Sequence, residues 1–225
     1  MSLDAAGFLP SPQDRWCDIG PTGSGKTELA RAILTNFDNV VVIDPKLEFT
    51  WGSLAKSDPK RYRRIARSLK DLHKQLEQVH RDRSGDPIIY RAPWNEVSTG
   101  AIDIIPLWAL KRKDTMLFYD ELENCVKSGG WEYLAPNFTA CCMQGRSKFV
   151  GMGFGIKSPT QIPRVILREA RLRYIFYLEL EADQKRAEEL YGGPIDWDEL
   201  LDQEFTWMFR NRKVKSGPHW LPASL

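Results

Sequence analysis

The sequence has few of the residues that most often bind zinc, with only 4 cysteines and 3 histidines in 225 residues. These residues are Cys17, Cys125, Cys141, Cys142, His73, His80 and His219. No two cysteines form a C-x-x-C pair, and the histidines have no regular spacing. The pattern argues against a zinc site and favours reduced thiols in a cytosol-like compartment.

Long hydrophobic runs, a signal-peptide pattern and internal repeats are also lacking. No apolar run approaches the length that a membrane-spanning helix needs, so we expect a soluble protein without a membrane span. The formal net charge is only +2 although 28% of the residues are charged, so any binding of a polyanion must depend on a local patch. The length predicts one domain at residues 15–225, preceded by an N-terminal arm at residues 1–14.

The hydrophobic pattern alternates between strands and helices. Strands are predicted at residues 15–19, 40–44, 87–92, 116–120, 149–156, 174–178 and 205–210. Helices are predicted at residues 26–36, 162–170 and 182–191, and helical spacing links Leu69, Leu72, Leu76 and Val79. This alternation predicts an α/β fold with a mostly parallel central sheet and helices on both faces.

A glycine-rich motif of the form G-x-x-x-x-G-K-T lies between the first predicted strand and helix. It consists of Gly20, Pro21, Thr22, Gly23, Ser24, Gly25, Lys26 and Thr27. Such a loop turns its backbone N–H groups toward the phosphates of a nucleotide, and the helix dipole favours the same charge. We expect Lys26 to reach the β- and γ-phosphates of ATP and the Thr27 hydroxyl to bind Mg²⁺.

An acidic pair, Asp120 and Glu121, ends the apolar strand predicted at residues 116–120. Beside a P-loop, Asp120 is placed to hold Mg²⁺ through its water shell, and Glu121 to activate an attacking water as general base. The alternative is that both residues cap a helix N-terminus. A water-activating glutamate argues against a kinase, which positions a substrate hydroxyl instead.

Further charged residues leave two interpretations open. Asp44, Lys46 and Glu48 follow the second strand at its C-terminal end, where they could tune the site or cap a helix. The basic residues between positions 56 and 70 are more typical of a solvated helix face. The loop at residues 127–131 contains Lys127 and Trp131. If the subunits form a ring, this loop could contact the phosphates and bases of DNA; the alternative is an ordinary turn.

Several motifs together resemble those of a known group of ATPases. They are Asp-Pro-Lys-Leu-Glu at residues 44–48, Asp-Glu at 120–121, Gly-Arg at 145–146, and Ser-Pro-Thr-Gln-Ile-Pro at 158–163. With the P-loop, they resemble the HerA–FtsK group of DNA-pumping ATPases over about residues 17–180. In size the chain is most similar to that group's viral branch, the genome-packaging ATPases of tailless double-stranded-DNA viruses.

The resemblance implies a RecA-like ATPase domain that works as a ring, with a hexamer as the expected form. The implied function is ATP-driven translocation of double-stranded DNA, packaging a viral genome into a preformed capsid. The implied partners are DNA and capsid or membrane-vertex proteins, in the cytoplasm of an infected host cell or at a virion vertex. Alternatives are an ATPase for filamentous-phage assembly or conjugation-type DNA transfer and, more distantly, a monomeric small-molecule kinase.

The resemblance also implies roles for particular residues. The family has a γ-phosphate-sensing Gln at the end of the strand after the Asp-Glu strand, and the corresponding residue is Lys157 or Gln161, depending on the register. Arg146 matches the family's Gly-Arg position and is a candidate arginine finger for the neighbouring subunit; otherwise it is a surface arginine. The other candidates for the finger are Arg168, Arg171 and Arg173.

Overall fold

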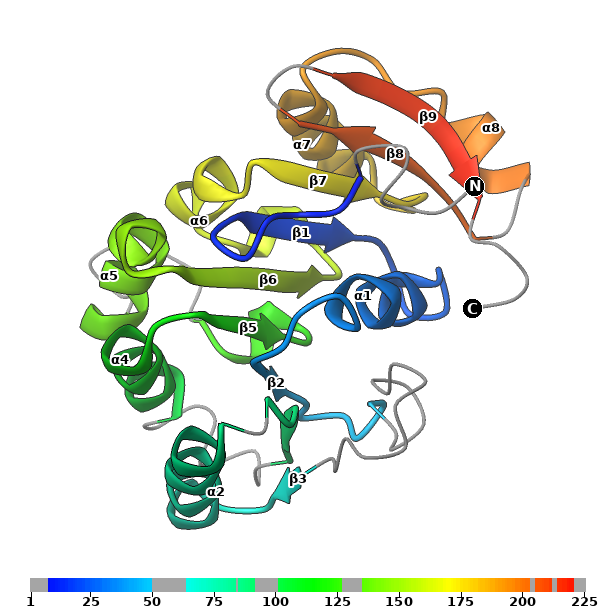
Figure 1. Ribbon diagram of the computed structural model, residues 1–225. Helices are drawn as coiled ribbons and strands as arrows, with labels where there is room; N and C mark the ends of the chain where they lie inside the picture. The colour runs from blue at the N-terminus through cyan, green and yellow to red at the C-terminus, as the bar shows by residue number, and fades with distance from the viewer. Residues whose placement is uncertain are drawn as a thin grey trace.

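A single mixed β-sheet forms the centre of the computed structural model, which describes residues 8–49, 64–83, 85–91, 101–126, 135–202, 205–211 and 214–220. Within these ranges the sheet has nine strands in the order β3-β4-β2-β5-β6-β1-β7-β8-β9 (Figure 1). The strands are β1 (Arg15–Ile19), β2 (Val40–Ile43), β3 (Arg64–Ala66), β4 (Ile88–Tyr90), β5 (Thr115–Tyr119), β6 (Val150–Ile156), β7 (Leu172–Ile175), β8 (Thr206–Arg210) and β9 (Lys215–Trp220). Pairing is parallel from β3 to β7 and antiparallel for β7-β8 and β8-β9.

Helices cover both faces of the sheet. They are α1 (Lys26–Leu34), α2 (Leu69–Asp82), α4 (Ile102–Arg112), α5 (Pro136–Gln144), α6 (Arg164–Glu169), α7 (Glu181–Tyr191) and α8 (Trp197–Asp202). Short 3₁₀ turns occur at η3 (Leu122–Asn124), η5 (Gly145–Lys148) and η6 (Pro159–Gln161). One hydrophobic core lies between α1 and the sheet, and a second packs the other helices against the opposite face. None of the helices in the described part is both long and apolar enough to cross a bilayer.

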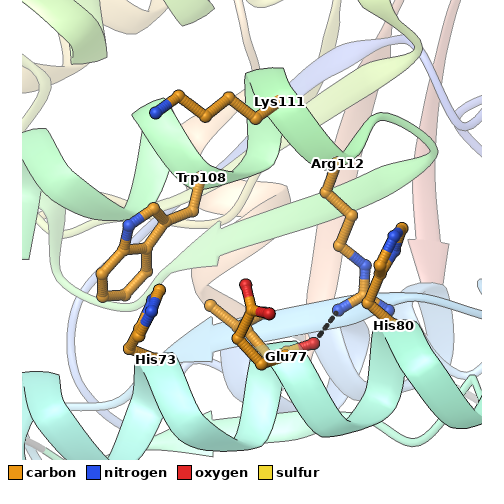
Figure 2. A pocket seen from close by; sticks show the side chains of 7 residues that line it. His73, Glu77, His80, Trp108, Lys111 and Arg112 are labelled. Atoms are coloured by element: carbon orange, nitrogen blue, oxygen red, sulfur yellow. Dashed lines mark hydrogen bonds between the residues drawn. The ribbon is translucent and has the colours of Figure 1, made fainter.

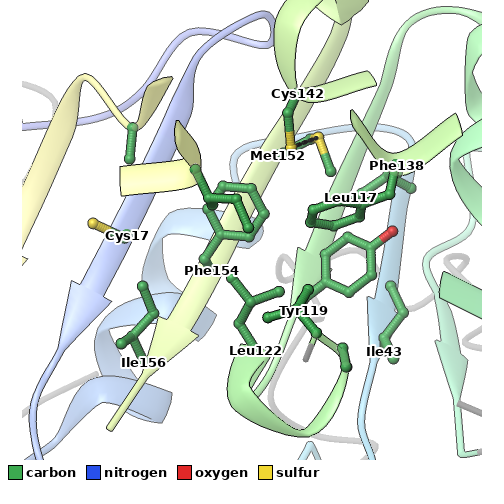
Figure 3. Packing of buried hydrophobic residues seen from close by; sticks show 14 of the residues in the cluster. Cys17, Ile43, Leu117, Tyr119, Leu122, Phe138, Cys142, Met152, Phe154 and Ile156 are labelled. Carbon is green, nitrogen blue, oxygen red and sulfur yellow. Dashed lines mark hydrogen bonds between the residues drawn. The ribbon is translucent and has the colours of Figure 1, made fainter. Parts of the chain in front are cut away.

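The two cores explain why the predicted strands are almost uninterrupted apolar runs. Neighbouring residues of one strand point to opposite faces, and both faces are buried. In β5, Phe118 enters the α1 core, whereas Leu117 and Tyr119 enter the other. Figure 3 shows the second core, in which Tyr119 meets Phe138 edge to face at a ring-centroid distance of 5.3 Å.

Glycines in β6 make room for large groups on the α1 face. A Cβ on Gly153 would lie 2.4 Å from the Trp16 indole and 2.8 Å from the Phe118 ring. Because no side chain occupies this position, Trp16 and Phe118 stack across β6 with centroids 5.2 Å apart. The glycines that weaken β6 as a predicted strand are therefore what allow its neighbours to pack.

Several sequence predictions need correction. The strand predicted at residues 174–178 lies at Leu172–Ile175, and the sheet becomes antiparallel after it. The elements α4, α5, α8, β3 and β9 were not predicted from the sequence. Pro106 lies inside α4, and Gly217 and Pro218 lie in β9 at the sheet edge. Proline usually interrupts a helix and proline and glycine usually interrupt a strand, so neither α4 nor β9 was predicted. The loop at residues 127–131 and the basic residues before Arg64 lie outside the described residues.

We expect Gly153→Ala to lower the free energy of unfolding by about 1–3 kcal/mol, because the new methyl group overpacks the Trp16–Phe118 stack. Urea unfolding of both proteins measures the difference. Gly193→Ala is the matched control, since a Cβ there would meet only Lys215 Nζ, at 3.4 Å. Equal effects of the two substitutions would contradict this view of β6.

Candidate active site

The glycine-rich loop leaves β1 at the C-terminal edge of the parallel strands. The Gly20 N–H donates to the Ile156 carbonyl of β6 at 2.9 Å, and α1 begins at Lys26. Gly23 and Gly25 adopt φ values of +84° and +94°, which other residues rarely adopt. A Cβ on Gly20 would lie 2.7 Å from the Phe176 Cβ. The loop therefore needs its glycines, and it leads into a helix N-terminus as a phosphate-binding loop does.

A cavity of about 470 Å³ opens beside this loop. It is lined by Thr22, Gly23, Gly25, Lys26, Thr27, Glu28, Lys46, Glu48, Asp120, Glu121 and Phe205. The structure thus brings together the glycine-rich loop, the acidic pair and the charged residues after β2, which are far apart in the sequence. A cavity of this size and polarity suits a nucleoside triphosphate.

Lys26 and Thr27 both have partners within the protein. The buried Lys26 ammonium donates to the Pro21 carbonyl at 2.6 Å, folding back onto its own loop. Burial lowers the pKa of Lys26, and the nearby charges of Asp18 and Asp120 oppose this shift. The Thr27 hydroxyl donates to Glu48 Oε2 at 3.1 Å. Each interaction is one that a phosphate or a metal ion could replace.

Asp44 organises the turn after β2. Its fully buried carboxylate accepts hydrogen bonds from the backbone N–H groups of Glu48 at 3.0 Å and Phe49 at 3.1 Å. Arg91 Nε lies 3.5 Å from Asp44 Oδ2. Asp44 therefore supports the turn, whereas Lys46 and Glu48 extend from it into the cavity.

Glu121 is the centre of a buried charge cluster. Its carboxylate forms ion pairs with Lys46 and with Lys157, the latter at 2.6 Å, and accepts a hydrogen bond from Asn124 Nδ2 at 2.8 Å. Burial would raise the pKa of Glu121, but the hydrogen bonds from Lys157 and Lys46 lower it below its ordinary value. The Glu121 backbone has a φ of +52°, an uncommon conformation that is frequent at functional sites.

The segment after β6 brings Lys157, rather than Gln161, to this cluster. Lys157 directly follows the last residue of β6, whereas Gln161 is exposed on η6. Glu123 accepts hydrogen bonds from the backbone N–H groups of Lys157 and Ser158, the latter at 2.8 Å. Asp183 of α7 accepts hydrogen bonds from the Ser158 and Thr160 hydroxyls at 2.9 and 2.7 Å. Glu123 and the buried Asp183 thus fix the segment that carries Lys157.

The candidate arginines do not reach the cavity of their own chain. Arg146 is exposed on η5, just before β6, at the edge of the sheet opposite the glycine-rich loop. It lies between two exposed apolar side chains, Met143 and Phe149. Arg173 donates to the carbonyls of Leu190 and Leu167 at 2.9 and 3.1 Å, which is a structural role.

The remaining two arginines are also remote from the glycine-rich loop. Arg168 is exposed on α6, and Arg171 precedes β7. The backbone N–H of Arg171 donates to the carbonyl of Arg15, the first residue of β1, at 2.8 Å. Both therefore lie near the N-terminal ends of the strands.

A buried carboxyl group, Asp18, was missed by the sequence analysis. A Cβ on Gly155 would lie 3.1 Å from Asp120 Oδ1 and 3.3 Å from Asp18 Oδ1, so the two carboxyl groups converge over this glycine. Both oxygens of Asp18, and Oδ2 of Asp120, lack a hydrogen-bond partner among the described residues. Burial raises the pKa of Asp18 well above its ordinary value and that of Asp120 to about 7. The sequence signal that could have identified Asp18 is its position as an ionisable residue inside the apolar strand before the P-loop.

The oxygen donors fit Mg²⁺. In the described ranges no group of three or more His, Cys, Asp or Glu side chains is arranged to hold a metal ion by itself. Mg²⁺ is usually held by only one or two protein oxygens together with phosphates and water. The Thr27 hydroxyl and the unpartnered Asp120 oxygen supply donors of this kind beside the phosphate-binding loop.

A separate cavity of about 280 Å³ lies between α2 and α4, away from the glycine-rich loop. Figure 2 shows His73 and His80 on α2 facing Trp108 and Arg112 on α4. The rings of His73 and Trp108 have centroids 4.9 Å apart, and Arg112 donates to the Leu76 carbonyl at 3.3 Å. These contacts join the two helices.

Three similar solved structures are described as an NTPase, as ATPases or as a complex with ATPγS. The genome packaging NTPase B204 from Sulfolobus turreted icosahedral virus 2, in complex with AMPPCP, has a TM-score of 0.64 and 13% identity, covering 94% of this chain and 100% of that one. EssC (ATPases 2 and 3) from Geobacillus thermodenitrificans gives 0.56 and 11%, covering 94% and 40%. The pCW3 conjugation coupling protein TcpA with ATPγS gives 0.51 and 12%, covering 90% and 58%.

These comparisons establish the fold. The chain shares the α/β fold of these solved structures, with a mostly parallel central sheet flanked by helices, as the sequence predicted. Searches of protein-family models and of curated proteins gave no match.

We expect Asp18→Asn to stabilise the nucleotide-free protein increasingly as the pH rises. In the unfolded chain the pKa of an aspartate is about 3.9. Because the folded-state pKa of Asp18 is raised, its contribution to the free energy of unfolding falls as the pH rises above that value. Asn cannot ionise, so the variant should gain on the parent by about 1–3 kcal/mol between about pH 5 and pH 8.

Urea unfolding in EDTA at both pH values measures this gain. Asp198→Asn, which changes an exposed carboxylate, is the control and should show no such trend. If the difference in free energy of unfolding between Asp18→Asn and the parent does not change with pH, the pKa of Asp18 is not raised in the folded protein.

Proposed function

We propose that this protein hydrolyses ATP to translocate double-stranded DNA and that it packages a viral genome into a preformed capsid. The observation that carries the proposal is the single cavity in which Lys26, Asp120 and Glu121 meet. Support comes from the fold, which is shared over the full length of a protein described as a genome packaging NTPase.

The residues of the cavity divide the chemistry of hydrolysis among them. Lys26 neutralises charge on the β- and γ-phosphates. Thr27 and Asp120 would hold Mg²⁺, which would further neutralise charge on the phosphate oxygens. Glu121 accepts a proton from the water whose oxygen attacks the γ-phosphorus, and the bond from that phosphorus to the bridging oxygen of ADP breaks. The products are ADP and inorganic phosphate.

The lysines around Glu121 give the site a way to respond to a triphosphate. Lys46 and Lys157 are paired with the Glu121 carboxylate in the structure. A γ-phosphate in the cavity offers the same two ammonium groups a more highly charged partner. In this proposal ATP draws Lys46 and Lys157 away, and Glu121 becomes free to accept a proton from water.

The position of the exposed apolar side chains supports assembly into a ring. Leu47, Leu201 and Phe205 are exposed near the glycine-rich loop, and Met143 and Phe149 are exposed at the opposite edge around Arg146. Two different patches on opposite edges suit a head-to-tail contact, which closes into a ring when the rotation permits. In that contact Arg146 of one subunit faces the nucleotide of the next.

Other motors with this fold are the second candidate. The conjugation coupling protein and EssC are both similar to this chain, which spans 58% and 40% of their solved structures. It spans all of the packaging NTPase. The pairing of Glu121 within the cavity disfavours a small-molecule kinase.

We expect linear double-stranded DNA to raise the ATPase rate severalfold, with little sequence preference and with an effect that weakens as salt rises. Contacts to phosphates are common to all sequences and release counterions. Steady-state phosphate release against DNA concentration, at two salt concentrations, measures this. Lys26→Ala, which should be inactive with and without DNA, excludes a contaminating ATPase. Hydrolysis indifferent to DNA at low salt would favour a motor for another polymer.

We expect Arg146→Ala to lower the ATPase rate by about a thousandfold, as removal of an arginine finger does. A finger acting in trans predicts complementation. Mixing Arg146→Ala chains with Lys26→Ala chains should restore part of the activity, because some sites join an intact P-loop to an intact arginine. Mixed rings as inactive as their components would contradict the trans role, and full activity of Arg146→Ala alone would exclude the residue.

A further inference from the structure

A second cavity, of about 250 Å³, adjoins the phosphate cavity on the other side of the glycine-rich loop. The two cavities share Thr22, Gly23 and Phe205 in their linings. A ligand whose phosphates lie on the loop is therefore adjacent to both cavities.

The linings of the two cavities differ in chemistry. The phosphate cavity contains lysine and carboxylate side chains, whereas none of the described residues that line the second cavity is charged. Its walls include the backbone of the loop, Tyr177 after β7, and Leu201 and Phe205 around the start of β8. An uncharged, partly aromatic cavity suits a planar, uncharged group.

Phe205 is the most unusual residue of this lining. It is 47% exposed, although a large aromatic side chain gains from burial, and its backbone adopts a φ of +62°. Leu201 beside it is 55% exposed. Apolar area open to solvent next to a highly charged cavity indicates a surface that a ligand covers.

We propose that this second cavity is the nucleoside subsite, in which the base stacks on Phe205 and contacts Leu201 and Tyr177 while the phosphates occupy the first cavity. The inference rests on the proposed nucleotide hydrolysis and adds how the site holds the base. Stacking is available to every base, because each has a π-face.

The same lining predicts low discrimination between bases. Strong selection requires buried polar or charged groups matched to the edge of one base. The described lining has no charged side chain for this purpose. The kcat/KM values for ATP and GTP should therefore differ by no more than about 200-fold, which is the upper end of the discrimination that apolar contacts achieve.

Equilibrium binding to the purified full chain tests the subsite, with AMPPCP, GMPPCP and inorganic tripolyphosphate as probes. Phe205→Ala should weaken binding of both nucleotide analogues by about tenfold and leave tripolyphosphate binding unchanged. Phe205→Trp, which keeps a stacking surface, should retain parental affinity. Leu180→Ala is the matched control, since Leu180 is 65% exposed and lines neither cavity.

The outcomes separate this inference from the proposed function. If the parent binds neither the analogues nor tripolyphosphate, the proposed hydrolysis is wrong and the subsite falls with it. If the parent binds AMPPCP and Phe205→Ala binds it equally well, the base lies elsewhere and only the subsite is overturned. Equal weakening of tripolyphosphate and AMPPCP would also overturn it, because Phe205 would then shape the phosphate cavity. A thousandfold preference for one base would contradict recognition by stacking.

Discussion

The site depends on the pairing of opposite charges at the C-terminal edge of the parallel strands. A charge removed from water costs several kcal/mol unless a partner compensates it. Lys46 and Lys157 compensate Glu121, and Lys26 lies among the charges of Asp18 and Asp120. These side chains lie in or after β1, β2, β5 and β6, so the cluster exists only when these four strands lie side by side.

Local signals account for what could be predicted from the sequence. The P-loop and the Asp120–Glu121 pair are contiguous motifs, and the central strands are apolar runs, so both were recognisable. The meeting of Lys46 with Glu121 and of Asp18 with Asp120 depends on which strands are neighbours, which periodicity does not reveal. The choice between Lys157 and Gln161 depends on where the turn after β6 is fixed, and Glu123 and Asp183 fix it from distant segments.

The arrangement links binding to chemistry through a change of partners. In the structure, Lys26 is bound to its own loop, Thr27 to Glu48, and Glu121 to two lysines. In the proposed mechanism a magnesium-bound triphosphate replaces these internal contacts, so the energy of binding is used to release the general base. A diphosphate lacks the terminal group that competes for Lys46 and Lys157 and should leave Glu121 paired.

The most direct test of this exchange is the affinity of Glu121→Gln for AMPPCP and for ADP, each measured with Mg²⁺ by calorimetry. Neutralising Glu121 removes the competitor for Lys46 and Lys157, so AMPPCP should bind about tenfold more tightly than to the parent, a gain of about 1.4 kcal/mol, while ADP changes little. Glu28→Gln controls for charge alone, since Glu28 lines the same cavity but pairs with Arg31. Equal effects on AMPPCP and ADP, or the same gain in Glu28→Gln, would contradict the account.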